Sequence, residues 1–195
     1  QGCKVTHFDI SQPMIDKAKE LARQAGVLEQ ITFVKGALED LSAFDSKSFD
    51  LVISFDAPIS YTYPHQEQVI QELVRLAGKR IIISVSSRMG YLPYLANLLQ
   101  KNQFILDENC DDSWVRWCVA NKDNAVKSFS FDEKAAEKLL AEGLMGGEKE
   151  IAEYEQGGAP WCITYTFMPD ELRDILSRSG VKNIELAGPG AYART

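Results

Sequence analysis

An aspartate follows a short β-favouring run and precedes the start of a helix, a position where carboxylates often contact ligands. Val5 to Phe8 favours a strand, and Asp9 ends it. Ser11 can cap the next helix, and Pro13 fits its first turn, where a missing N–H costs nothing. In α/β sheets ligands bind at the carboxyl ends of the strands, where a carboxylate can accept hydrogen bonds from both hydroxyls of a ribose. Asp9 can equally be a simple turn or capping residue, so both interpretations stay open.

The segments around this aspartate alternate between helix and strand patterns. Apolar residues recur at helical spacing from Met14 to Ala25, Gly26 follows where a helix would end, and a second helix is predicted to end at Gly78. Strands are predicted over 5–8, 31–34, 49–55 and 80–85. The third strand has the continuous apolar centre of a parallel strand covered on both faces. These patterns predict an α/β, doubly wound sheet, with at most a short helix near 39–44.

The alternation stops in the middle of the chain and returns near its end. Helices are predicted over 92–100, 133–142, 148–155 and 169–179, and strands over 164–167 and 181–186. We interpret 1–90 and 161–195 as the sheet domain, and 91–160 as a mainly helical insertion that forms a lid over the carboxyl ends of the strands. Three tryptophans in or beside the insertion can face a bound acceptor or form its private core: Trp114, Trp117 and Trp161.

Composition narrows the possible functions. The chain has 195 residues, of which 45% are hydrophobic and 25% charged, with a net charge of −7 and a pI near 4.9. Such an acidic chain is unsuited to wrapping nucleic acid electrostatically, so we expect no nucleic-acid partner. No apolar run reaches membrane-spanning length and no signal peptide is visible, so a cytoplasmic location is the expectation. Four cysteines without CxxC spacing and only two histidines indicate neither a zinc site nor a disulfide framework.

Four stretches, in their order and spacing, resemble a known enzyme family. They are HFDISQPMIDKAKELA, ITFVKGALEDL, SFDLVISFDAP and FMPDELRDILSRSGV. Together they are similar to class I S-adenosylmethionine-dependent methyltransferases of the type 11 kind, over roughly 5–85 and 164–190. The resemblance implies a Rossmann-like fold, S-adenosylmethionine as the cofactor, and methyl transfer to a small-molecule acceptor inside a lidded pocket.

The resemblance also implies roles for residues at the first strand. Asp9 matches the acid that holds the ribose hydroxyls. Ile10 and Met14 match side chains that flank the adenine, although Met14 can also be a plain core residue of the helix.

Two later loops match further parts of the cofactor site. Leu38 and Glu39 lie in the loop that meets the adenine ring. The family often has an acid at the position of Ala37, so the backbone N–H of Leu38 is the expected contact and Glu39 can simply be solvated. Phe55 and Asp56 match the border of the methionine part, although Asp56 can also be a turn acid.

Methyl transfer from a sulfonium requires little side-chain chemistry. The protein mainly aligns the donor and the acceptor and excludes water, and a general base is needed only if the acceptor must lose a proton. Weak candidates for that base are Tyr61, Tyr63 and His65. The two tyrosines can instead cover the core, and His65 can simply begin a helix. No Asn-Pro-Pro-Tyr motif for amino-nitrogen methylation is present.

The start of the chain departs from the family pattern. A glycine-rich loop is expected about 20 residues before Asp9, but only eight residues precede it. We therefore expect the natural gene to encode an upstream segment with a first strand and that loop. In the family, this strand lies between the strands that end at Asp9 and Phe55. That position should be a gap or be filled by a strand from elsewhere.

Two other functions remain as alternatives. A nicotinamide-dependent oxidoreductase also carries an acid after its second strand, but a Tyr-x-x-x-Lys pair is missing. A non-catalytic methyltransferase-like subunit that binds a protein partner is favoured by the missing glycine loop and disfavoured by the retained Asp9, Phe55 and Asp56.

Overall fold

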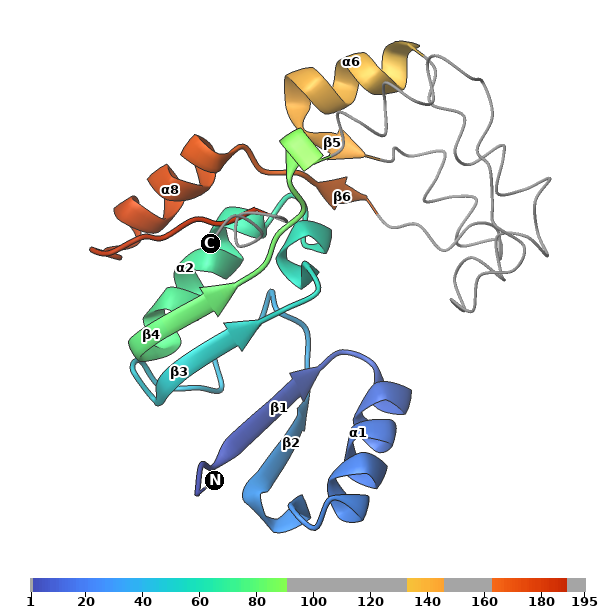
Figure 1. Cartoon of the computed structure of the whole chain (residues 1–195), viewed down its shortest axis with the longest axis vertical. Helices are drawn as coiled ribbons and strands as arrows, with labels where there is room; N and C mark the ends of the chain where they lie inside the picture. The colour runs from blue at the N-terminus through green and yellow to red at the C-terminus, as the bar shows by residue number, and fades with distance from the viewer. Residues whose placement is uncertain (1, 91–132, 146–162, 189–195) are drawn as a thin grey trace, which may run out of the picture.

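The structure is a computed structural model and describes residues 2–90, 133–145 and 163–188 (Figure 1). The elements in chain order are β1 (Val5–Asp9), α1 (Gln12–Gln24), η1 (Leu28–Gln30), β2 (Ile31–Lys35), β3 (Phe49–Ser54), η2 (Pro58–Tyr61), α2 (Gln66–Leu76), β4 (Ala77–Ile83), α6 (Glu133–Glu142), β5 (Leu144–Met145), β6 (Thr164–Tyr165) and α8 (Pro169–Arg178). None of the helices in these ranges is long and apolar enough to cross a membrane.

Four of the strands form two parallel pairs. β1 pairs with β2 from Val5↔Ile31 to Asp9↔Lys35, and β3 pairs with β4. β1, β3 and β4 point the same way, so their carboxyl ends lie toward one side of the molecule, which we call the carboxyl edge (Figure 1). The predicted alternation of strands and helices is thus confirmed, and parallel pairing is the arrangement that such connections favour.

The two pairs do not join into one sheet. β1 is hydrogen-bonded to β2 and β3 to β4, and no described strand occupies the free edge of β1 or of β3. This agrees with the predicted gap between these strands. The prediction that the third strand is covered on both faces is wrong for the described structure. Leu51 and Ile53 alternate with half-buried Val52 and lie exposed, because no described helix covers their face.

Helix α1 begins and ends as its sequence predicts. Ser11 lies in extended conformation and its hydroxyl accepts a hydrogen bond from the backbone N–H of Met14 at 3.4 Å. Gly26, with φ +68°, takes the left-handed conformation that commonly ends a helix. The helix buries Ile15 and Ala22 against its own strand pair.

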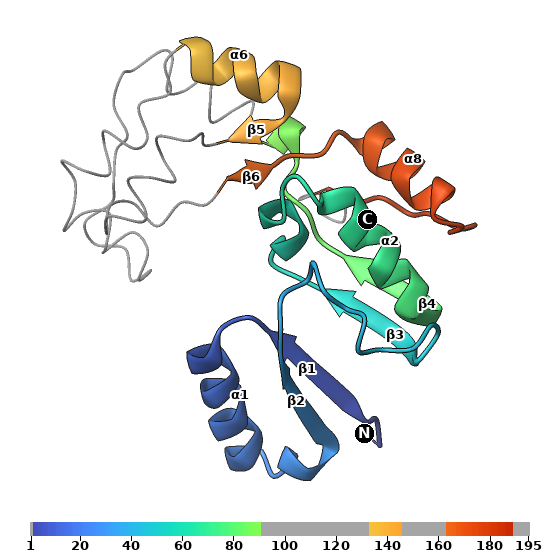
Figure 2. The same ribbon diagram turned by 180° about the vertical axis from the view of Figure 1, so that it is seen from behind.

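The main core lies on one face of the β3–β4 pair. α2 and α8 pack side by side there, as Figures 1 and 2 show from opposite sides. The buried members of this core are Leu41, Ile59, Val69, Ile70, Leu73, Leu76, Phe167, Leu172, Ile175 and Leu176. Phe44 connects the two sheets, because its ring meets Phe8 of β1 at 5.8 Å and Phe49 of β3 at 5.5 Å between centroids.

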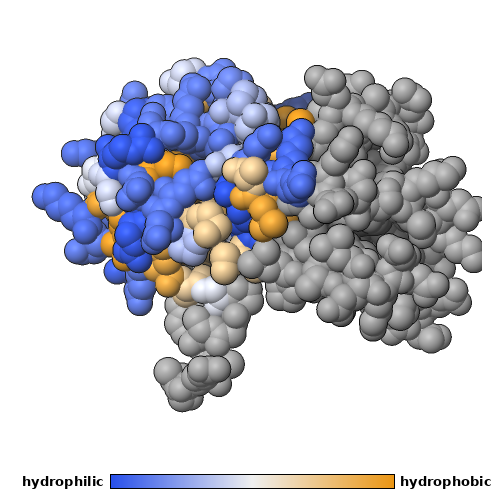
Figure 3. Space-filling model, turned by 90° about the horizontal axis from the view of Figure 1, so that it is seen from above, coloured by the Kyte–Doolittle hydropathy of each residue, from blue (hydrophilic) through white to orange (hydrophobic). Residues whose placement is uncertain are grey.

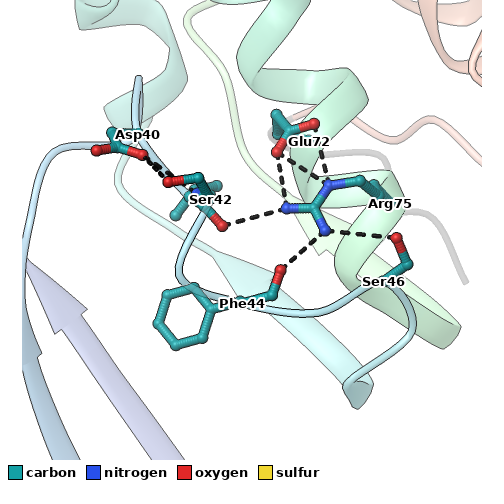
Figure 4. A network of polar contacts seen from close by, with 7 residues as sticks. Asp40, Ser42, Phe44, Ser46, Glu72 and Arg75 are labelled. Atoms are coloured by element: carbon teal, nitrogen blue, oxygen red, sulfur yellow. Dashed lines mark hydrogen bonds and ion pairs between the residues drawn. The ribbon is translucent and has the colours of Figure 1, made fainter.

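An arginine holds the connection between β2 and β3, where the sequence allowed a short helix near 39–44. The structure has turns there instead. Arg75 donates hydrogen bonds to the carbonyls of Leu41 (3.1 Å) and Phe44 (2.8 Å) and pairs with Glu72 at 2.8 Å (Figure 4). These contacts occupy carbonyls that a helix would have paired internally.

Two predicted boundaries are wrong. α2 ends at Leu76, and Gly78 lies inside β4 rather than ending the helix. A Cβ at Gly78 would lie 3.2 Å from the carbonyl oxygen of Phe49, so the glycine allows two strands to approach closely beside a register shift. The segment 181–186, predicted as a strand, has no strand pairing within the described residues, while the helix before it, α8, agrees with the prediction.

Only part of the predicted insertion falls within the described residues. The helix over 133–142 is confirmed as α6, and β5 then pairs antiparallel with β6. These elements lie beyond the carboxyl ends of β3 and β4 (Figures 1 and 2). The other predicted helices of the insertion, at 92–100 and 148–155, and all three tryptophans lie outside the described residues, so the lid stays a prediction. From the side of α6 and α8, the described surface is mainly hydrophilic with separate apolar patches (Figure 3).

Candidate functional site

Asp9 lies at the carboxyl end of β1, as predicted, and keeps part of its hydrogen-bonding capacity free. Its Oδ1 accepts a hydrogen bond from the backbone N–H of Ser11 at 2.7 Å. Oδ2 has no protein partner within the described residues, and the side chain is half-buried. The turn role and a ligand role are therefore compatible, because a carboxylate offers about four acceptor sites and the turn uses one.

Two apolar side chains stand in solvent beside this carboxylate. Ile10 is 68% exposed and Met14 is 59% exposed, while the same helix buries Ile15. The interpretation of Met14 as a core residue is therefore wrong. An exposed apolar pair next to a half-buried carboxylate suits a ligand with a flat apolar part and a polar hydroxylated part.

The loop after β2 is fixed beside Asp9. The backbone N–H of Gly36 donates to the carbonyl oxygen of Asp9 at 3.0 Å, and a Cβ at Gly36 would lie 2.6 Å from the ring of Phe8. Leu38 is half-buried against the core, so its side chain is used in packing, and Glu39 is exposed. Only the backbone of Leu38 remains for the predicted ligand contact.

The backbone turns sharply where β3 ends. Asp56 has φ +69° and Ala57 has φ +55°, two consecutive left-handed residues that are not glycine. The N–H of Ala57 donates to the hydroxyl of Ser84, just beyond β4, at 3.2 Å. Phe55 is 59% exposed. Left-handed non-glycine residues are uncommon and occur both in tight turns and at functional sites, so the cofactor role of Phe55 and Asp56 stays a prediction.

The three candidate bases follow this turn. Tyr61 and Tyr63 are exposed, and His65 is the N-cap residue of α2 without a side-chain capping bond. The ring of Tyr63 stacks on Tyr165 of β6, with centroids 6.0 Å apart and an interplanar angle of 8°. The catalytic role of these three residues stays a prediction.

Sequence reasoning missed a polar cluster behind Tyr63. The hydroxyl of Tyr165 donates to Glu171, and Arg88, with only 13% of its side chain exposed, lies 3.6 Å from the same carboxylate. Burial, and secondly the hydrogen bond to Glu171, raise the pKa of Tyr165 to about 12. The hydroxyl of Tyr165 therefore stays protonated well above neutral pH. The one available signal was Glu171 two residues after Pro169, since a first-turn acid of this kind can close a helix cap.

The predicted residues form two groups along the carboxyl edge. The first contains Asp9, Ile10, Met14 and the loop at Leu38, at the ends of β1 and β2. The second contains Phe55, Asp56, Tyr61, Tyr63 and His65, beyond β3. Within the described residues there is no cluster of three or more His, Cys, Asp or Glu that could hold a metal ion.

Comparison with known proteins gives one family. Residues 1–79 match the family described as "Methyltransferase domain". A solved structure from Methanococcus maripaludis, provisionally described as an S-adenosyl-L-methionine-dependent methyltransferase, is 15% identical, with 84% of this chain and 67% of that chain covered and a TM-score of 0.38. A TM-score this low does not establish a shared fold. No curated protein matches the chain.

Proposed function

We propose that this chain, whose residues 1–79 match the methyltransferase domain family, binds S-adenosylmethionine at its carboxyl edge and transfers the methyl group to a small-molecule acceptor. The observation that carries the proposal is the arrangement at the end of β1. There, Asp9 has a free carboxylate oxygen beside the exposed Ile10 and Met14. This set fits adenosine, because the carboxylate can accept from ribose hydroxyls while the apolar pair contacts the base.

The other predicted residues would contact the cofactor in the order in which they lie along the carboxyl edge. The backbone of Leu38, with Glu39 beside it, would meet the adenine, and Phe55 and Asp56 would border the methionine part. S-adenosylmethionine supplies a methyl group that is already activated on a sulfonium. The residues of the chain orient the two reactants and exclude water. Tyr61, Tyr63 or His65 would accept a proton only if the acceptor must lose one.

Binding of S-adenosylhomocysteine, measured by calorimetry, tests the proposal without knowledge of the acceptor. Asp9→Ala should weaken binding by at least about tenfold, since hydrogen bonds to a charged group contribute about 1.5–3 kcal/mol. Asp9→Asn keeps an acceptor for the N–H of Ser11 and should weaken binding less. Asp16→Ala removes the same charge from the exposed side of α1 and serves as the matched control.

Three results would contradict the proposal. The ribose role is wrong if Asp9→Ala binds as the unmodified chain does. A thermal shift with a nicotinamide cofactor, and none with S-adenosylhomocysteine, would favour the oxidoreductase instead. Equal losses in Asp9→Ala and Asp16→Ala would show a general charge effect rather than a specific contact.

A further inference from the structure

We propose that Ser84 is a positioning residue of the carboxyl edge, because its hydroxyl holds the turn at Asp56 in the conformation that contacts the amino-acid part of the cofactor. The inference rests on the proposed function, in which Asp56 borders the methionine part of S-adenosylmethionine. Ser84 lies directly after β4 and 27 residues after Ala57, the second residue of the turn.

The turn after β3 lacks the backbone hydrogen bond that usually closes a turn of its kind. Asp56 and Ala57 are consecutive left-handed residues. Such a turn is usually closed by a hydrogen bond from the N–H of the residue after the pair to the carbonyl oxygen of the residue before it. The residue after this pair is Pro58, which has no N–H. The conformation of the turn therefore depends on other contacts.

The hydroxyl of Ser84 supplies such a contact from the neighbouring strand. It accepts a half-buried hydrogen bond from the N–H of Ala57 at 3.2 Å. Because a peptide group is planar, holding this N–H fixes the plane that joins Asp56 to Ala57, and so limits the directions open to the Asp56 side chain. The carbonyl oxygen of Ala57 accepts from the N–H of Ser60 at 2.9 Å. Ala57 is thus held on both sides, and Ser84 acts on the side of Asp56.

Ser84 is itself held in place by the pairing of β3 with β4. Its backbone N–H donates to the carbonyl oxygen of Ser54 at 2.8 Å, just beyond the pair Ser54↔Ile83. The hydroxyl is therefore presented from a paired strand, which places a side chain more precisely than a loop does. Asp56 is exposed, and a carboxylate fixed at this place suits the ammonium group of an amino acid.

Calorimetry on the whole chain with two probes, S-adenosylhomocysteine and adenosine, tests the inference. Adenosine has no amino-acid part, so its binding reports on the residues at the end of β1. Ser84→Ala should weaken binding of S-adenosylhomocysteine by about three- to tenfold, the range of one neutral hydrogen bond, and leave binding of adenosine unchanged. Ser84→Thr keeps the hydroxyl and should bind both probes as the unmodified chain does.

Ser60→Ala is the matched control. The hydroxyl of Ser60 joins the same two segments, because it accepts from the N–H of Ser86 at 2.8 Å, but this bond does not involve the peptide group next to Asp56. Its loss should leave the ratio of the two affinities unchanged. Asp9→Ala should weaken binding of both probes, since both carry the ribose.

These variants separate failure of the inference from failure of the proposed function. The role of Ser84 is wrong if Asp9→Ala weakens both probes while Ser84→Ala binds S-adenosylhomocysteine normally or loses affinity for both probes equally. A selective loss in Ser60→Ala as well would show a general loosening of the connection, and would also overturn it. If Asp9→Ala changes the affinity for neither probe, the proposed function fails and the inference fails with it.

Discussion

Gly143 is the glycine whose replacement the structure predicts to be most damaging. It has φ +77°, and an added Cβ would lie 2.1 Å from Arg88 Nη2 and 2.8 Å from the carbonyl oxygen of Thr166. Gly26 offers a matched control, since its φ is +68° and nothing lies within 4 Å of the added Cβ. The two substitutions to alanine therefore share the cost of a left-handed residue and differ in the space available.

The expected magnitudes follow from these contacts. A left-handed non-glycine residue costs about 1–2 kcal/mol, and this is the whole expected effect of Gly26→Ala. Gly143→Ala must also displace Arg88 from the carbonyl of Thr166, to which it donates at 3.0 Å. Losing a hydrogen bond to a charged group adds about 1.5–3 kcal/mol, so Gly143→Ala should lower the free energy of unfolding by roughly 2.5–5 kcal/mol.

Urea unfolding at 25 °C measures both variants, and a double-mutant cycle with Arg88→Ala assigns the difference. The double variant should be less unstable than the sum of its parts by at least about 1 kcal/mol, because the side chain that clashes is already gone. Equal costs for Gly26→Ala and Gly143→Ala, or strict additivity in the cycle, would refute the predicted packing of Arg88 on Gly143.

Two further predictions concern Tyr165 and the start of α1. The folded pKa of Tyr165, about 12, lies above its ordinary value of 10.0, so the stability that it contributes is fully present below pH 10 and is lost as pH rises toward 12. Unfolding of Tyr165→Phe compared with the unmodified chain across pH 8–12 should show this difference, and parallel curves would contradict it. In urea unfolding, Ser11→Ala should lower the free energy of unfolding by about 0.5–1 kcal/mol, at the low end for helix caps because the capping hydrogen bond is 3.4 Å long. Ser11→Gly should lower it by only a few tenths of a kcal/mol, and a larger loss for glycine than for alanine would contradict the capping role.

The sequence predicted the ends of helices and strands well where they depend on interactions between residues close together in the chain. Ser11 and Gly26 mark the ends of α1, and Asp9 lies at the carboxyl end of its strand, because capping and turn chemistry depend on neighbouring residues. Gly78 misled the prediction, since a glycine that ends a helix and one that permits a close strand contact look alike in sequence.

The parts that sequence could not predict depend on contacts between distant segments. Arg88 and Glu171 meet Tyr165 only because β4 continues beside β6 and α8, as the bridge between Ser87 and Phe167 shows. The left-handed pair Asp56 and Ala57 likewise has no glycine to signal it. The prediction of a strand over 181–186 was wrong because a strand needs a neighbouring strand to pair with, and the hydrophobic pattern of a segment does not reveal that neighbour.

The division of the strands into two separate pairs has a consequence for cooperativity. Ile15 and Ala22 of α1 lie outside the main core cluster, and Phe44 provides the ring contacts that join β1 to β3. Among the described residues, Phe8 is the member of β1, α1 or β2 that packs against that core, so we expect this unit to open more readily than α2 and α8 separate. A ligand that touches the ends of both β1 and β3 would bind only when both units are folded. It would thereby couple two separate opening reactions into one.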